Sequence, residues 1–297
     1  MKVLVFGAGG QVGHEVRRAI WPASVELAAL DRHAADVASA PAVNAAIGRE
    51  RPDLVMNLAA YTAVDRAESE PEAAWEANCA GAAHIAAVCG DLATPLIHLS
   101  TDYVFDGRKT EPYREDDTVN PLGVYGRSKE AGERAVRAAA LDHVILRTAW
   151  IYGAHGANFV KTMLRLGSER PVLRVVADQQ GCPTAAADIA GAVVAIAELI
   201  RRGSMEWGTY HFAAADSASW FSFADEIIGL AGRLGAWAGG AEPRLEAITT
   251  DEYSTAAHRP ANSVLDCSKI RGLSISPPPW RASLPAVIRE LVAAERR

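Results

Sequence analysis

Cysteine, positive charge and long apolar runs are all scarce in this chain. Its four cysteines form no CxxC pair or other metal-binding spacing, so buried free thiols are expected at Cys79, Cys89, Cys182 and Cys267. No apolar run is long enough for a membrane span, and no signal peptide precedes the strand predicted at residue 2. The net charge of −6 argues against a nucleic-acid or anionic-membrane surface. We therefore expect a cytoplasmic protein with neither kind of partner.

Apolar residues, by contrast, are plentiful. Hydrophobic residues make up 49% of the 297 residues and charged ones 22%, which supports a sizeable core. Strands are predicted at residues 2–6, 25–30, 53–57, 96–100 and 143–147. Helical patterns are predicted at residues 11–20, 71–89, 125–140, 158–166 and 186–201. This alternation indicates an α/β fold with a Rossmann-like, doubly wound parallel sheet. After about residue 204 the pattern becomes irregular.

A glycine-rich turn follows the first predicted strand. Gly7, Gly10 and Gly13 stand between that apolar run and the first helical pattern. A strand, a tight turn and a helix together aim backbone N–H groups and the helix N-terminus at a pyrophosphate. The spacing is GxxGxxG rather than the commoner GxGxxG, and such a pattern alone is weak. Asp31 strengthens it, because this residue follows the second strand at about the distance typical of an acid on the adenosine ribose.

The residues at the end of the second strand leave the choice of dinucleotide open. The Asp31 carboxylate would accept hydrogen bonds from a ribose 2′-OH and repel a 2′-phosphate. Arg32 beside it could pair with that phosphate. The pair favours NADH slightly over NADPH, and use of both is left open.

Polar residues follow the fourth predicted strand in the segment Ser100-Thr-Asp-Tyr-Val-Phe-Asp-Gly107. Ligands in open α/β sheets bind at the carboxyl ends of the strands, so the Thr101 hydroxyl is placed to donate to a substrate oxygen. Strand-end serine and threonine residues also often satisfy local backbone groups. Thr101 alone therefore decides little.

Tyr125 and Lys129 are four residues apart, so on a helix they lie one turn apart on the same face. Free tyrosine has a pKa of about 10 and is a poor acid or base near neutrality. A nearby ammonium and an oxidised nicotinamide would favour the phenolate, so we expect a lowered pKa for Tyr125. Such pairs are common on helices, but this one follows a glycine turn and a Ser-Thr strand end. The combination predicts a nicotinamide-dependent enzyme that acts on a carbonyl or an alcohol.

These motifs define two expected parts of the chain. Residues 1–150 are predicted to form an NAD(P)-binding Rossmann-like domain, completed by residues 185–212. Residues 151–184 and 213–297 are predicted to form a smaller, irregular α/β substrate-binding lobe across the carboxyl ends of the strands.

The motifs are also those of a known family. The chain resembles the extended short-chain dehydrogenase/reductases, and within them most closely the dTDP-4-dehydrorhamnose reductases, from residue 1 to the last helix. The glycine turn and Tyr125-Gly-Arg-Ser-Lys129 mark only the superfamily. The segments that point to the reductase branch are 57–68, 100–107, 147–152, Asp178-Gln-Gln-Gly-Cys-Pro-Thr184 and Arg259-Pro-Ala-Asn-Ser263.

The resemblance implies roles for individual residues. Thr101, Tyr125 and Lys129 would be catalytic, and the last two would also face the nicotinamide ribose. The implied cofactor-binding positions are Gly7, Gly10, Gln11, Val12, Gly13, Asp31, Asp36, Val37, Ala60, Tyr61 and Thr62. A helix N-cap would explain Asp36 equally well. The implied substrate-binding positions are Thr101, Asp102, Trp150 and Arg259; core packing is the alternative for Trp150, and a structural salt bridge for Arg259.

The implied reaction is the NADPH- or NADH-dependent reduction of a dTDP-linked 4-keto-6-deoxy sugar at C4, for polysaccharide precursors. Two alternatives stay open: a nucleotide-sugar epimerase, and a non-catalytic NAD(P)-binding regulatory subunit. A homodimer is also left open, as is a structural Mg²⁺ that Glu15 and Glu290 could help to bind at a subunit contact.

Overall fold

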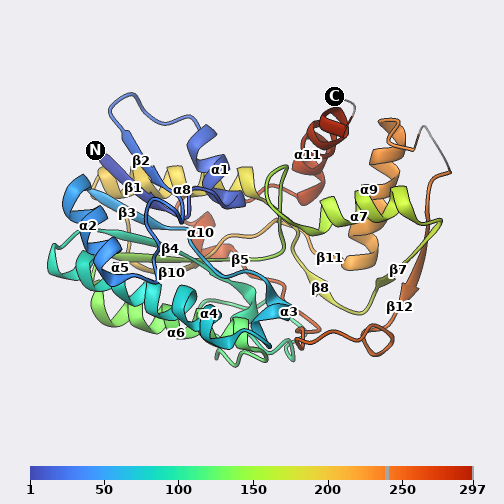
Figure 1. Cartoon of the computed structure of the whole chain (residues 1–297), viewed down its shortest axis with the longest axis horizontal. Helices are drawn as coiled ribbons and strands as arrows, with labels where there is room; N and C mark the ends of the chain where they lie inside the picture. Colours follow the sequence, from blue (N-terminus) through green and yellow to red (C-terminus); the bar gives the residue numbers. More distant parts are fainter. Residues whose placement is uncertain (238–240, 296–297) are drawn as a thin grey trace.

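The computed structural model describes residues 1–237 and 241–295 (Figure 1). Its strands are β1 Lys2–Phe6, β2 Glu26–Leu30, β3 Leu54–Asn57, β4 Leu96–Thr101, β5 His143–Thr148, β6 Ile151–Tyr152, β7 Val172–Val176, β8 Gln180–Gly181, β9 Thr184–Ala185, β10 Gly208–His211, β11 Ala218–Ser219 and β12 Arg244–Ile248. Its α-helices are α1 Gln11–Arg18, α2 Ala40–Glu50, α3 Val64–Ala67, α4 Pro71–Trp75, α5 Gly81–Asp91, α6 Val124–Ala139, α7 Phe159–Glu169, α8 Ala186–Arg201, α9 Trp220–Arg233, α10 Ser268–Arg271 and α11 Trp280–Glu295. A π-helix, η1 Glu76–Ala80, joins α4 to α5, and 3₁₀ turns lie at Asp102–Val104 (η2) and Thr250–Glu252 (η3).

The main sheet has six parallel strands in the order β10-β5-β4-β3-β1-β2. The predicted α/β class with a parallel central sheet is confirmed. The chain leaves β1 for β2 on one side and returns to β3 on the other. The strand order therefore reverses beside β1, and ligands of such sheets bind at the carboxyl ends of the strands near this point.

Alternating apolar residues explain why both faces of this sheet are covered. Val3 and Val5 of β1 belong to one core cluster, whereas Leu4 and Phe6 belong to the other, and all four are fully buried. Helices α1 and α8 pack together on the first face, and α2, α5 and α6 on the second (Figure 1). This sandwich fixes the positions of the loops that follow β1, β3 and β4.

Two predicted features differ from the structure. The helix predicted at residues 71–89 is interrupted by η1, which turns Asn78 toward the loop after β3. The region after residue 204 is more regular than predicted, because it contains the long helices α9 and α11. Helix α9 has a capping box between Ser219 and Ser222. Helix α11 buries Trp280, Leu284, Ile288 and Val292 at intervals of four residues, a pattern that Pro285 and the preceding prolines disguise.

The remaining strands form three small pairs beside the main sheet. Strand β7 pairs with β12, β8 with β11 and β6 with β9. Helices α7 and α9 pack together next to β7 and β12, at the right of Figure 1. No helix in the described residues has the length and apolar character needed to cross a membrane.

Candidate active site

The glycine turn after β1 is built for close approach. Gly7 has φ +81°, and a Cβ atom placed on it would lie 2.5 Å from the backbone N of Ala59, after β3. Gly10 is the N-cap of α1, and no side chain caps that helix. The first N–H groups of α1 therefore remain available to an anion at the reversal point of the sheet. Val12 is different: it points into the core and is 4% exposed.

The loop after β2 holds its charged residues in local contacts. Asp31 is exposed, and its Oδ1 accepts a hydrogen bond from Ala34 N at 2.9 Å. Arg32 donates instead to Asp36 Oδ2 at 3.1 Å. Asp36 is not a helix N-cap, because Ser39 takes that position on α2. Val37 is buried, and its carbonyl lies 3.1 Å from Nδ1 of His84 on α5. The N-cap alternative for Asp36 is therefore wrong.

One amide that the sequence analysis did not identify joins the loop after β3 to helix α6. Asn78 in η1 is 1% exposed. Its Oδ1 accepts from Tyr61 N at 2.8 Å, and its Nδ2 donates to Tyr61 O at 3.1 Å and to Ser128 Oγ at 3.0 Å. Ser128 Oγ in turn donates to the carbonyl of Tyr125 at 2.9 Å. Gly132 of α6 lies so close to the Asn78 carbonyl that a side chain there would clash. In the sequence, Asn78 stands out as a polar residue within an alanine-rich helical pattern, and this was the feature that could have indicated its role.

Replacing Asn78 with alanine is expected to loosen the loop that carries Ala60, Tyr61 and Thr62. The change removes three hydrogen bonds and leaves the backbone N–H and C=O of Tyr61 without partners. We expect a loss of about 1–3 kcal/mol in the free energy of unfolding, together with weaker dinucleotide binding. Urea unfolding and dinucleotide fluorescence titration measure the two effects. Wild-type dinucleotide affinity in the variant would contradict this role for Asn78.

Thr101, Tyr125 and Lys129 come from β4 and α6. Thr101 is the last residue of β4, 6% exposed, and its Oγ1 donates to Asp102 Oδ1 at 3.0 Å while accepting from Tyr103 N at 3.2 Å. Tyr125 is half-buried in the first turn of α6. Lys129 is 2% exposed and donates from Nζ to the carbonyl of Leu99 on β4 at 2.7 Å. The backbone thus anchors the ammonium one helical turn beyond the phenol.

The acidity of these groups differs from the expectation. Burial raises the pKa of Tyr125 to about 12, although a hydrogen bond with Thr101 acts in the opposite direction. The expected lowering by Lys129 is therefore not seen in the ligand-free protein. Burial lowers the pKa of Lys129 to about 8, against the attraction of Glu133. Near neutral pH the phenol is protonated, which suits a proton donor.

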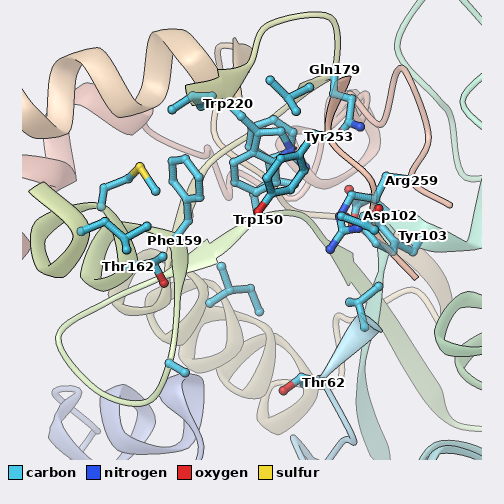
Figure 2. A pocket seen from close by; sticks show the side chains of 18 of the residues that line it. Thr62, Asp102, Tyr103, Trp150, Phe159, Thr162, Gln179, Trp220, Tyr253 and Arg259 are labelled. Atoms are coloured by element: carbon cyan, nitrogen blue, oxygen red, sulfur yellow. Dashed lines mark hydrogen bonds between the residues drawn. The ribbon is translucent and has the colours of Figure 1, made fainter. Parts of the chain in front are cut away.

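A cavity of about 750 Å³ brings together seven of the seventeen expected site residues. Gln11, Thr62, Thr101, Asp102, Tyr125, Trp150 and Arg259 line it. Figure 2 shows three aromatic residues, Trp150, Trp220 and Phe159, on one side of the cavity. The side chains of Asp102, Tyr103 and Arg259 lie on the other side. Among the described residues, the glycine turn, Asp31, Asp36 and Val37 do not line this cavity. The cavity therefore includes the strand ends, whereas the loop after β2 lies outside it.

Trp150 and Arg259 already have protein partners. The Trp150 ring stacks on Trp220 with a centroid separation of 3.4 Å and an interplanar angle of 2°, and its backbone has φ +45°. Arg259 donates from both terminal nitrogens to Asp65, the shorter contact being 2.7 Å. The salt bridge considered for Arg259 is thus present, and both side chains still face the cavity (Figure 2).

A buried cluster of charged side chains joins helix α6 to strands β4 and β5. Glu133 lies one turn beyond Lys129 and is fully buried. It accepts from Ser100 Oγ at 2.6 Å, from Nε and Nη2 of Arg147 on β5 at 2.9 and 2.8 Å, and from Arg137 Nη2 at 2.6 Å. In the sequence, Tyr125, Lys129, Glu133 and Arg137 recur at intervals of four residues, a spacing that places all four on one side of the helix.

The cysteines and the two glutamates considered for Mg²⁺ do not form a metal cluster. Cys89, Cys182 and Cys267 are buried free thiols, and Cys79 is a half-buried one. Glu290 pairs with Arg18 at 3.2 Å. No group of three or more His, Cys, Asp or Glu side chains suited to a metal ion occurs in residues 1–237 and 241–295.

Comparison with known proteins places these features in a family. Residues 1–293 match the model described as the RmlD substrate binding domain. A dTDP-4-dehydrorhamnose reductase of Sinorhizobium fredii is 43% identical over 95% of both chains. The crystal structure of one from Clostridium acetobutylicum superposes with a TM-score of 0.89, at 36% identity over 97% of this chain and 98% of that one. Another from Bacillus anthracis, in complex with NADP, has a TM-score of 0.88 at 34% identity over 97% and 99%.

Proposed function

The chain belongs to the family of the RmlD substrate binding domain, and from this membership we propose that it reduces dTDP-4-dehydro-β-L-rhamnose at C4 to dTDP-L-rhamnose. It is an NAD(P)H-dependent oxidoreductase of dTDP-rhamnose biosynthesis, a route to polysaccharide precursors. The observation that carries the proposal is the shared cavity of Thr101 and Tyr125, with Lys129 anchored one helical turn away.

The residues after β1, β2 and β3 fit a dinucleotide. Gly10 caps helix α1 and Gln11 and Val12 begin it, and its uncapped N–H groups suit a pyrophosphate; a side chain at Gly7 would clash with the backbone of Ala59. We assign Asp31 to a ribose hydroxyl, Asp36 and Val37 to the adenine side, and residues 60–62 to the nicotinamide half. When bound, the reduced dinucleotide supplies the hydride. We keep NADH as the slightly preferred form, because Asp36 already holds Arg32.

Tyr125 supplies the proton in this proposal. Its phenol is protonated near neutral pH and lines the cavity, so it can donate to the C4 oxygen as negative charge develops there. Thr101 donates a second hydrogen bond to the same oxygen. Lys129 then stabilises the phenolate that remains and orients the ribose, because its ammonium is fixed by the Leu99 carbonyl.

The substrate is assigned to the aromatic and basic side of the cavity. Trp150 offers a flat apolar surface for the sugar or the base, and Asp102 accepts hydrogen bonds from sugar hydroxyls. Arg259 has the planar geometry for a diphosphate if its pair with Asp65 rearranges. We accordingly propose that residues 1–150 with 185–212 bind the dinucleotide, and that residues 151–184 and 213–297 form the substrate-binding lobe.

Turnover with the defined substrate tests this function directly. We expect loss of absorbance at 340 nm when the protein is mixed with NADH or NADPH and dTDP-4-keto-L-rhamnose, and chromatography should identify dTDP-L-rhamnose. Both dinucleotides should react, NADH slightly faster. An epimerase would instead retain bound NAD through purification and show no net oxidation. A regulatory subunit would bind the dinucleotide, stay inactive and co-purify with a partner at fixed ratio.

Assembly and location are separate hypotheses. We propose a cytoplasmic homodimer, and Mg²⁺ near Glu15 and Glu290 as a bridging ion at its contact. Light scattering after size exclusion, with and without a chelator, measures both points. If the protein is a monomer in the presence of Mg²⁺, the dimer hypothesis is wrong. If the protein is a dimer that the chelator does not change, the hypothesis of a bridging ion is wrong.

A further inference from the structure

A buried carboxyl group lies next to Thr101. Asp102 follows directly after β4 and is 2% exposed. Its Oδ1 accepts the hydrogen bond from Thr101 Oγ1 at 3.0 Å. Its Oδ2 is buried and has no hydrogen-bond partner within the described part of the chain. Both residues line the cavity that also contains Tyr125 (Figure 2 labels Asp102).

The surroundings of Asp102 contain no paired cation in the described residues. The groups that face it are the phenols of Tyr103 and Tyr125, the Cys182 thiol and the Ser263 hydroxyl. Arg259 lines the same cavity, but it donates to Asp65 and to the carbonyl of Ala257.

Without a positive partner, burial raises the pKa of Asp102 to about 7, although the Ser263 and Thr101 hydroxyls act in the opposite direction. The group therefore gains and loses its proton near neutral pH. A carboxylate kept only for structure would be expected to have both oxygens satisfied.

We propose that Asp102 is the proton reservoir of the site and refills Tyr125 through the hydroxyl of Thr101. The inference rests on the proposed function, in which Tyr125 gives up its proton to the substrate oxygen. The 3.0 Å separation of Thr101 Oγ1 and Asp102 Oδ1 suits a hydrogen bond in either direction, and Thr101 and Tyr125 line the same cavity. In the proposed relay, a protonated Asp102 donates to Thr101, and Thr101 donates to the Tyr125 phenolate.

The proton transfer balances without any redox change. The carboxyl O–H bond of Asp102 breaks as an O–H bond forms on Thr101. The original O–H bond of Thr101 breaks as the Tyr125 phenolate regains its proton. Asp102 is left as a carboxylate and takes its next proton from water that enters the cavity. One proton enters per turnover, as reduction of a ketone requires.

The Asp102→Asn variant tests whether Asp102 acts as a proton reservoir or only makes a structural contact. Asparagine keeps the shape and the hydrogen bond with Thr101 but cannot release a proton. In the wild type, kcat should fall as pH rises through about 7, because the reservoir empties. In the variant, kcat at pH 6.5 should be about tenfold to a hundredfold lower and should show no inflection near pH 7. A wild-type inflection in the variant would overturn the proposal.

Thr148→Val is the matched control. Thr148 pairs with Thr101 in the register of β4 and β5, lines the same cavity, and has a buried Oγ1 without a partner within residues 1–237 and 241–295. Its loss perturbs the same wall but removes no titrating group, so the inflection near pH 7 should remain. Loss of that inflection in Thr148→Val would count against Asp102 as its source.

A second measurement needs no substrate. In ligand-free protein labelled with ¹³C at the aspartate carboxyl carbons, one resonance should titrate near pH 7 and be absent from Asp102→Asn. If that variant does not fold, the resonance should persist in Asp188→Asn, in which a half-buried aspartate whose pKa is also raised has been removed. If no aspartate titrates between pH 6 and 8, the reservoir proposal is wrong, whereas the proposed reductase function is unaffected. If Asp102 titrates in this range but the protein does not turn over the sugar, the proposed function is wrong instead.

Discussion

Tyr125→Phe should lower kcat/KM about a thousandfold while dinucleotide binding stays close to wild type. The substitution removes one oxygen and leaves the ring that packs at the start of α6. The Tyr125 phenol lines the cavity and is the group to which we assign the direct proton transfer, so the variant lacks that donor. A thousandfold loss corresponds to about 4 kcal/mol of transition-state stabilisation. Steady-state kinetics and fluorescence titration with NADPH measure the two quantities.

Tyr103→Phe is the control for this experiment. The Tyr103 ring meets Tyr125 edge-on at 5.8 Å and also lines the cavity, so its loss changes the same surroundings by one oxygen. We expect kcat/KM to stay within about tenfold of the wild type, because Tyr103 has no assigned proton transfer. Comparable losses in both variants would indicate that the cavity wall matters rather than one acid. An active Tyr125→Phe enzyme would rule out Tyr125 as the donor.

Glu133→Ala should produce the largest loss of stability, about 3–5 kcal/mol in the free energy of unfolding. Glu133 and Arg147 are 0% and 2% exposed, and removing the carboxylate leaves the Arg147 charge buried without its partner. The double variant Glu133→Leu with Arg147→Met should recover most of this loss, since two apolar groups need no partner. Urea unfolding followed by circular dichroism provides the values. A single variant as stable as the wild type would contradict the assignment.

The same cluster predicts how stability depends on pH. Burial alone would raise the pKa of Glu133, but the hydrogen bonds and charge of Arg147 outweigh it, and the pKa falls to about 2. A lowered pKa stabilises the fold above the unfolded value of about 4.3, and this contribution is lost as pH falls toward 2. The urea midpoint should therefore drop over that window, and less so in Glu133→Gln. Glu198→Gln, which removes a surface ion-pair partner of Arg201 and Arg202, should change the midpoint near neutral pH only slightly.

Local sequence patterns predicted the parts of the fold that depend on neighbouring residues. The strand–turn–helix at residues 2–18 and the four-residue spacing of Tyr125 and Lys129 follow from backbone periodicity, and the structure contains both. Helices α9 and α11 were missed because prolines and aromatic residues obscured an apolar spacing that was present. The roles given to Thr101, Tyr125 and Lys129 stay proposals, although the structure brings the first two to one cavity.

The sequence by itself determined the class of fold, the family and the face on which each motif lies. Only the tertiary structure decided what surrounds those motifs. Asn78 meets Tyr61 and Ser128, 17 and 50 residues away in the chain, and Glu133 meets Arg147 on a neighbouring strand. Likewise, the acidity of Asp102 and Tyr125 depends on burial by elements distant in the sequence. The physical reason is that periodicity fixes direction along one element, whereas desolvation and hydrogen bonding depend on packing between elements.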